Sequence, residues 1–133
     1  KKISIINDSK STSYSSSIEM LKKNNNIYWL LGGMPKKGDK FYLSKKYQRN
    51  IRGYIFGANH KKFLLDLKNR IKHKRFFNLK KALDELFNDI KKDNSSKKTI
   101  LFSPAAASFD SFKNFEDRGL YFNKLIKRYI NVR

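Results

Sequence analysis

The chain has 133 residues, which is the size of one domain and enough to bury roughly two-thirds of the surface that its unfolded form exposes. It contains no cysteine, which excludes a disulfide framework, a thiolate metal site and a thiol nucleophile. No apolar run approaches the roughly 18 residues of a membrane span, and the amino end lacks the apolar core of a signal peptide. Since the sequence has no starting methionine and opens almost at once into an apolar strand, we expect a piece of a longer chain.

The formal net charge is +20, from 31 Lys and Arg against 11 Asp and Glu. Such a balance is typical of proteins that bind nucleic acid or an anionic membrane surface. The chain is also rich in Asn, Ile, Phe and Tyr, whose codons, like those of Lys, are poor in G and C, and its lysines are spread along the sequence. We therefore interpret the charge as compositional drift, which is compatible with a weak attraction for phosphorylated small ligands.

Apolar runs alternate with amphipathic segments along the chain. In order, the expected elements are strand 3–6, helix 14–23, strand 27–31, helix 41–47, strand 53–57, helix 60–70, strand 75–77, helix 79–92, strand 99–102 and helix 115–130. The clearest helix is 79–92, because its apolar residues share one face. This alternation predicts an α/β, Rossmann-like three-layer domain, whose mostly parallel sheet of five or six strands has helices on both faces.

A stretch of small residues, from Ser103 to Phe115, follows the last predicted strand and leads into the last predicted helix. Pro104 interrupts the strand, three alanines keep the segment slim, and Ser108 adds a hydroxyl at its far end. In open α/β sheets, ligands bind in the crevice beyond the carboxyl ends of the strands. We therefore expect this stretch to form one wall of a substrate site.

Two further loops, at residues 7–12 and 32–37, also leave the carboxyl ends of predicted strands with polar side chains. Since these ends lie on one edge of a parallel sheet, the three loops together offer a set of polar groups. These groups are Asp8, Lys10, Thr12, Lys36 and Ser108. Lysines for charge and hydroxyls for direction suit an anionic ligand.

Each of these residues also has a purely structural explanation. Asp8 or Thr12 would equally serve as the N-cap of the first helix, and Ser108, in competition with Asp110, would cap the last one. Lys36 would by default be a solvated loop residue in so lysine-rich a chain. Spacing alone therefore leaves both interpretations open.

Other familiar catalytic patterns are missing from the sequence. The GxxxxGK[ST] phosphate loop is matched nowhere, and Gly32-Gly33 is more typical of a turn. His60 and His73 have no carboxylate at metal-ligand spacing, so we interpret both as surface residues. No acid–base carboxylate pair and no Ser/His/Asp arrangement stands out.

Three motifs occur in order and at suitable spacing: NDSKST at 7–12, LLGG with a following lysine at 30–36, and SPAAASFDSFKNFEDRG at 103–119. Together they resemble the carboxy-terminal domain of the D-glutamate-adding Mur ligases, and the resemblance covers essentially the whole chain. The 103–119 motif is long and specific, the 7–12 motif is moderately so, and the double glycine is weak alone. Met34-Pro35 replaces more polar residues usual in the family, which leaves Lys37 as an alternative to Lys36.

The resemblance implies a cytoplasmic, ATP-dependent enzyme of peptidoglycan synthesis with three domains, of which residues 1–133 would be the last. ATP phosphorylates the carboxylate of UDP-N-acetylmuramoyl-L-alanine, and the amine of D-glutamate then attacks the acyl phosphate. ATP and Mg²⁺ would be held mainly by the central domain, outside this chain. We therefore expect no catalytic residue and no metal ligand in this domain, no nucleic-acid or membrane partner, and no ligase activity from the chain alone.

The resemblance also implies roles for individual residues. The residues expected to bind D-glutamate, through side chains or, at position 109, through the backbone amide, are Lys36, Thr12, Ser108, Phe109 and Phe115. Asp8 and Lys10 would reach the ribose and the phosphates of ATP. In these roles the domain positions substrates and leaves the stabilisation of charge at the phosphates largely to other parts of the enzyme.

Two alternatives remain. One is the equivalent domain of a related amide ligase, of the Mur or folylpolyglutamate type, against which the long 103–119 match argues. The other is a basic nucleic-acid-binding module, but the chain lacks the motifs of an RRM and the spacing of zinc or helix-turn-helix modules. Amino-acid specificity would distinguish the first alternative, and steep salt dependence of binding would reveal the second.

Overall fold

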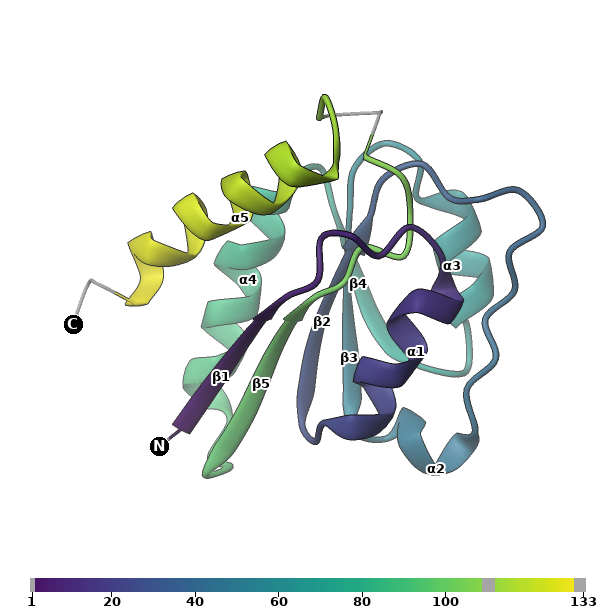
Figure 1. Ribbon diagram of the computed structural model, residues 1–133. Helices are drawn as coiled ribbons and strands as arrows, with labels where there is room; N and C mark the ends of the chain where they lie inside the picture. Colours follow the sequence, from purple (N-terminus) through teal and green to yellow (C-terminus); the bar gives the residue numbers. More distant parts are fainter. Residues whose placement is uncertain (1, 109–111, 131–133) are drawn as a thin grey trace.

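The computed structural model describes residues 2–108 and 112–130. Its centre is a sheet of five parallel strands in the order β1-β5-β2-β3-β4 (Figure 1). The strands are β1 (Lys2–Asn7), β2 (Ile27–Gly32), β3 (Ile51–Phe56), β4 (Lys72–Phe76) and β5 (Lys97–Phe102). All four strand pairs are parallel, which confirms the predicted α/β class.

Helices cover both faces of this sheet (Figure 1). On one face lie α1 (Tyr14–Lys23) and α3 (Lys61–Leu67), and on the other lie α4 (Leu79–Lys92) and α5 (Phe115–Ile130). A single turn, α2 (Lys45–Gln48), precedes β3. The result is the three-layer, Rossmann-like arrangement that the alternation of strands and helices predicts.

The sheet separates two hydrophobic cores. In one core, Leu21 of α1 packs with Trp29 of β2, and in the other, Leu83 of α4 and Phe122 of α5 pack with Leu30 of β2. Successive residues of β2 thus point to opposite cores, and all six residues of the strand are buried. This is why β2 is a nearly continuous apolar run, as expected for a strand covered on both faces.

Predicted helices 14–23, 79–92 and 115–130 are confirmed at their predicted bounds. The predicted helix 41–47 is wrong, because residues 41–44 have no regular structure and the helix is the short α2. Phe41 is instead a buried loop residue, with its ring centroid 5.3 Å from that of Tyr14 and 5.9 Å from that of Trp29. The ring fastens the 33–44 loop to the core, which explains an aromatic residue outside any helix.

The edge strand β4 begins three residues before the predicted 75–77 and ends at Phe76. Phe77, which we predicted to be in this strand, lies beyond it and is 79% exposed. The strand is mostly exposed and rich in cations, so it carries little of the apolar signal by which buried strands are predicted.

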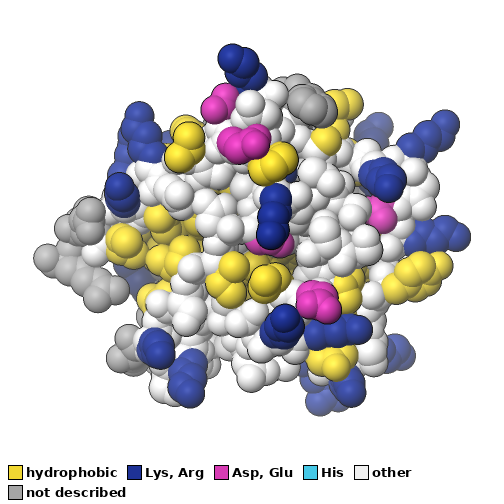
Figure 2. Space-filling view, in the orientation of Figure 1, with side chains coloured by type: hydrophobic (Ala, Val, Ile, Leu, Met, Phe, Trp, Pro, Cys, Tyr) yellow, Lys and Arg dark blue, Asp and Glu magenta, His cyan; other side chains and the backbone are white. Residues whose placement is uncertain are grey.

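Lys and Arg side chains stand out around most of the molecular outline in Figure 2. Acidic side chains on this face are fewer and lie between them. Within residues 2–108 and 112–130, no helix is long and apolar enough to cross a membrane.

Candidate functional site

The connections that follow β1, β5 and β2 lie side by side, because these strands are neighbours in the sheet (Figure 1). We name them the β1 loop (residues 8–13), the β5 loop (103–114) and the β2 loop (33–44). The β1 loop leads to α1 on one face and the β5 loop to α5 on the other, so the chain diverges there at a topological switch point. Open α/β sheets bind ligands at such points, and we therefore place the candidate site at this rim.

Backbone hydrogen bonds join the β2 loop to the β5 loop. Met34 and Ala107 form an antiparallel bridge with N···O distances of 2.8 and 2.9 Å. Between them and β2 lies Gly33, whose φ is 125°, and a Cβ at this position would lie 2.4 Å from the Ala107 carbonyl oxygen. Such close approach requires glycine. The bridge therefore joins the two loops two residues before Lys36 and one residue before Ser108.

A chain of buried hydroxyl groups connects the β1 loop, the β5 loop and α1. The backbone N–H of Ala105 donates to the Ser11 hydroxyl at 3.2 Å, and this oxygen lies 2.6 Å from that of Ser17. The hydroxyl oxygen of Ser17 lies 2.5 Å from that of Ser103. The Ser103 hydroxyl in turn donates to the Asp8 carboxylate at 2.8 Å. Donation in a single direction, toward Asp8, satisfies every member. Because every side chain in this hydrogen-bonded series is buried, the series holds the loops in one arrangement.

Arg118 of α5 contacts the same loops, and its side chain is fully buried. Nη1 donates to the carbonyl of Ala106 at 2.8 Å, while Nη2 and Nε donate to the carbonyl and hydroxyl of Ser9 at 2.6 and 3.2 Å. The Ser9 hydroxyl in turn donates to the Phe115 carbonyl at 2.7 Å. A Cβ at Gly33 would lie 3.3 Å from Nη1. One guanidinium group thus hydrogen-bonds the β1 and β5 loops and lies close to Gly33 of the β2 loop.

The far part of the β2 loop is anchored on α1 and α3. The Asp39 carboxylate accepts the backbone N–H of Tyr14 at 2.8 Å, and the ammonium of Lys62 donates to the Asp39 carbonyl. Lys36 and Lys37 lie between this anchor and the bridge to the β5 loop, and both are exposed. The fold therefore holds the loop at two points and leaves two ammonium groups available to an anion.

The predicted ligand residues occupy different environments at this rim. Lys10, Thr12 and Lys36 are exposed. Ser108 is buried, and Phe115, the first residue of α5, is 39% exposed. Phe109 and Asp110 lie outside the described residues. Asp8 is buried and bonded to Ser103, so its carboxylate already has an internal partner.

The helix caps differ from those suggested by the sequence. Ser13, rather than Asp8 or Thr12, is the N-cap residue of α1. At the start of α5, the Asn114 side chain accepts a backbone N–H of the first turn at 2.8 Å. Ser108 lies well before that helix and does not cap it. The purely structural explanation of Thr12 and Ser108 as caps is therefore wrong, and the functional explanation remains a prediction.

The charges at the rim suit a bound anion. Three lysines are exposed there, namely Lys10, Lys36 and Lys37. Both α1 and α5 begin at the rim, so the positive ends of two helix dipoles face it (Figure 1). Within the described ranges, no cluster of three or more His, Asp or Glu residues could hold a metal ion. The arrangement can thus bind and orient an anionic ligand through lysines, hydroxyls and backbone N–H groups.

Sequence reasoning missed two features of this rim. Arg118 was part of the 103–119 motif, but nothing distinguished it from the other basic residues of the chain. Nothing in the sequence singled out Ser11 and Ser17 in a stretch rich in serine, yet both are buried and hydrogen-bonded. A usable signal was the helical register, which places Arg118 on the same face of α5 as Phe122, four residues later.

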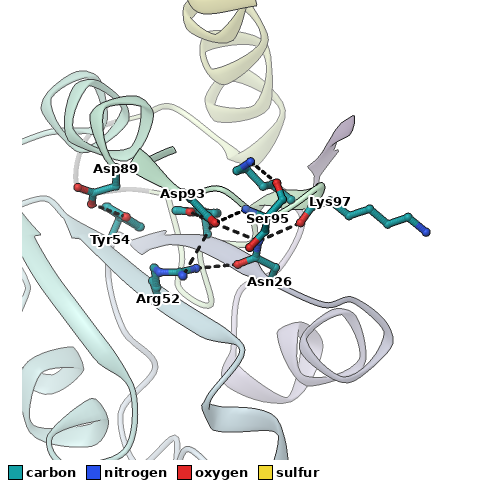
Figure 3. A network of polar contacts seen from close by, with 9 residues as sticks. Asn26, Arg52, Tyr54, Asp89, Asp93, Ser95 and Lys97 are labelled. Atoms are coloured by element: carbon teal, nitrogen blue, oxygen red, sulfur yellow. Dashed lines mark hydrogen bonds and ion pairs between the residues drawn. The ribbon is translucent and has the colours of Figure 1, made fainter. Parts of the chain in front are cut away.

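A second polar network lies at the opposite edge, where the strands begin (Figure 3). Arg52 donates to the Asn26 side chain at 2.8 Å and lies 3.9 Å from the Asp93 carboxylate. The Tyr28 hydroxyl and the Ser95 backbone N–H also donate to Asp93. These hydrogen bonds, that of Tyr28 above all, hold the pKa of Asp93 well below its usual range, because they favour the ionised carboxylate.

This network borders a cavity of about 530 Å³. The Tyr54 hydroxyl donates to Asp89 at 2.7 Å, and Lys74 forms ion pairs with Glu85 and Asp89 at 2.6 and 3.3 Å. Burial, followed by the bond to Asp89, raises the pKa of Tyr54 above its usual value. The carboxylates of this edge are engaged within the protein, and we interpret the network as structural.

The two histidines, which the sequence predicts to be surface residues, are half-buried. The Nε2 atom of His60 lies 2.6 Å from Nη1 of Arg75, and Nδ1 of His73 lies 2.7 Å from the carbonyl of Ile71. Both rings therefore have local contacts that do not involve the rim.

Comparison with known proteins identifies relatives over nearly the whole chain. A protein of Rickettsia felis named UDP-N-acetylmuramoylalanine–D-glutamate ligase is 38% identical over 127 residues, or 96% of this chain and 28% of the relative. Proteins of the same name from Wolbachia of Brugia malayi and from Agrobacterium fabrum are 37% and 34% identical, over 92% and 88% of this chain. No family model matches the chain. The chain spans about a quarter of the length of these curated relatives.

Proposed function

We propose that this chain, which is homologous to the D-glutamate-adding Mur ligases across 96% of its length, is their carboxy-terminal domain and binds D-glutamate at the rim of the β1, β2 and β5 loops. The observation that carries the proposal is the joining of these three loops. They contain the motifs of the resemblance, and the Met34–Ala107 bridge and Arg118 hold them against one another.

In the proposed reaction, ATP phosphorylates the carboxylate of UDP-N-acetylmuramoyl-L-alanine, and the amine of D-glutamate displaces phosphate from the acyl phosphate. This domain fixes the nucleophile. Holding an amine at the acyl carbon converts a bimolecular step into an effectively unimolecular one, which contributes to the rate without an acid–base residue. We assign the phosphate-binding loop and the Mg²⁺ ligands to the remaining three-quarters of such an enzyme, and we expect the isolated chain to be inactive.

In this proposal, the exposed Lys36 and Thr12 and the neighbouring Ser108 bind the two carboxylates of D-glutamate. Lys36 supplies charge, and hydroxyls supply direction. The backbone amide at position 109 and the ring of Phe115 complete the pocket. The rigid attachment of the loops supports this assignment, because a small amino acid is oriented well only by groups whose own positions are determined.

Lys10 is the residue that we propose to contact the phosphates of ATP, since its side chain is exposed on the β1 loop. The resemblance to the Mur ligases also implies that Asp8 contacts the ribose of ATP. Its carboxylate accepts the Ser103 hydroxyl and is buried, so we propose that it acts mainly by holding the β1 loop in place.

The decisive experiment compares Lys36→Ala with Lys37→Ala in a complete enzyme that contains this chain. Loss of a charge-assisted hydrogen bond leaves a carboxylate of D-glutamate unpaired and costs about 1.5–3 kcal/mol, or roughly 10- to 150-fold in KM. We expect this increase for D-glutamate in Lys36→Ala, with the KM for ATP changed much less. If Lys37→Ala has the larger effect, then position 37 is the ligand. Equal effects on both substrates would contradict the assignment.

The second candidate is the equivalent domain of a related amide ligase with another amino-acid substrate, which would bind that substrate at the same rim. Competition between D-glutamate, L-glutamate and folylpolyglutamate substrates in the complete enzyme separates the two candidates. We expect activity with D-glutamate and none with the others.

A further inference from the structure

The basic residues of this chain are more concentrated than their spread along the sequence suggests. Residues 40–81 contain fourteen Lys and Arg and a single carboxylate, that of Asp66. The rest of the chain has seventeen Lys and Arg against ten carboxylates. The question raised by this local excess is where its cations lie in the fold.

The fold collects part of this excess in one groove of about 790 Å³ at the amino ends of β3 and β4. Its basic lining residues are Lys45, Lys46, Arg49, Arg52, Arg70 and Lys72. The groove has no carboxylate among its lining residues, and of the six cations only Arg52 has an ion pair within the described part of the chain. Low-dielectric walls around charges of one sign concentrate the positive potential and attract anions.

An aromatic hollow of about 420 Å³ continues from the basic groove, and the two share Gln48 and Arg70 in their linings. Tyr42 lies in this hollow and is 74% exposed. Lys22 and Lys46 lie over the ring of the neighbouring Tyr47, at 5.9 and 5.1 Å from its centroid. In contrast, the ring of Tyr42 has no aromatic or cationic neighbour among the described residues, so its face is open to a ligand.

We propose that the basic groove and Tyr42 bind single-stranded nucleic acid, with the phosphodiester backbone along the cations and a base stacked on the Tyr42 ring. A charged groove next to an accessible aromatic face is the combination by which proteins bind single strands without sequence preference. The binding surface lies around α2, at the opposite edge of the sheet from the rim (Figure 1). It is therefore independent of the proposed ligase function, and both can hold together.

Two features favour a single strand over other polyanions. A duplex does not offer an unstacked base to an aromatic ring, so Tyr42 would have no role in binding it. A helix that lies on an anionic membrane buries an apolar face in the lipid, whereas the lining residues of this groove are polar or basic except for Ile51.

The test is fluorescence anisotropy of the 133-residue chain with a labelled oligothymidylate of about 12 nucleotides, at salt concentrations between about 50 and 200 mM. The groove variant is Lys45→Gln/Lys46→Gln/Arg49→Gln, which leaves Arg70 and its hydrogen bond to the Phe41 carbonyl intact. The matched control is Lys91→Gln/Lys124→Gln/Lys127→Gln, which removes the same charge from exposed positions of α4 and α5.

We expect the groove variant to bind the oligonucleotide at least about tenfold more weakly than the control variant does. Its slope of log K against log salt should be smaller in magnitude by about 2, because each of the three lost phosphate contacts contributes about 0.7 to that slope. Tyr42→Ala should lose about fivefold or more through stacking, and Tyr42→Phe should bind as the unsubstituted chain does. Equal losses in the groove and control variants would overturn the proposal. Tighter binding to a duplex of equal length, or binding to phosphatidylglycerol vesicles but not to the oligonucleotide, would overturn it as well.

Discussion

Replacement of Arg118 by methionine tests whether one buried guanidinium holds the β1 and β5 loops of the rim together. Methionine has a similar length and fills much of the same space, but it has no hydrogen-bond donor. The substitution removes the bonds to the carbonyls of Ala106 and Ser9 and to the Ser9 hydroxyl. Of the buried backbone carbonyls that then lose their charged donor, those of Ala106 and Ser9 had the two shortest bonds to it, and that of Ser11 had a longer one at 3.4 Å.

A buried acceptor left without its donor costs about 1–3 kcal/mol, so the two carbonyls together cost about 2–6 kcal/mol. Removal of a buried charge returns part of this, because the guanidinium no longer has to be desolvated. We therefore expect a loss of about 3 kcal/mol in the free energy of unfolding. For a domain of this size, each kcal/mol shifts Tm by about 3–5 °C, so the expected decrease is about 10 °C.

The assay is thermal and urea unfolding followed by circular dichroism, with Lys127→Met as the control. Lys127 is an exposed cation near the other end of the same helix, and its loss should change the free energy of unfolding by less than about 0.5 kcal/mol. Arg118→Lys keeps the charge but not the fork of donors, and it should fall between the two. If Arg118→Met and Lys127→Met unfold at the same temperature, the loops do not depend on the guanidinium.

Two further substitutions test the loop contacts and the opposite edge. Gly33→Ala should destabilise the protein by at least about 2 kcal/mol in a urea titration, because its Cβ would meet the Ala107 carbonyl oxygen. The control Gly38→Ala has a positive φ but open space around the new Cβ, so it should cost only about 1 kcal/mol. Similar losses for both variants would show that the loops separate without cost. Asp93 has a pKa lowered from 3.8, so its contribution to stability is present above pH 3.8 and is lost as the pH falls below that value. The difference in free energy of unfolding between the unsubstituted chain and Asp93→Asn, measured by urea titration, should therefore shrink from neutral pH to about pH 3, and a constant difference would contradict this account.

The parts of the fold that the sequence predicts well are those with strong periodicity. The helix 79–92 has apolar residues on one face and cations on the other, and its bounds are confirmed. Phe41 and the edge strand β4 show where this reasoning fails. A lone aromatic in a loop has no period, and the exposed, cationic β4 has little apolar pattern, so neither position could be assigned from local sequence.

The candidate site shows the same division. The meeting of the three loops follows from the parallel sheet, because the connections after neighbouring strands share an edge. The role of Arg118 does not follow, since one buried arginine among 31 basic residues has no distinguishing local sequence. The hydroxyl contacts that lead from Ser11 to Asp8 also depend on tertiary contacts between residues up to 95 positions apart.

The place of β1 in the sheet has a consequence for the order of folding. Among the described residues, this strand pairs only with β5, in a register that joins Lys2 to Lys97 and Asn7 to Phe102. During synthesis, β1 therefore lacks this partner strand until residues 97–102 have also been made. Contacts so distant in sequence form late, because a long loop must be closed before they add stability. We conclude that the β2–β3–β4 part of the sheet can form first, and that the rim is completed when both β5 and α5 have been made.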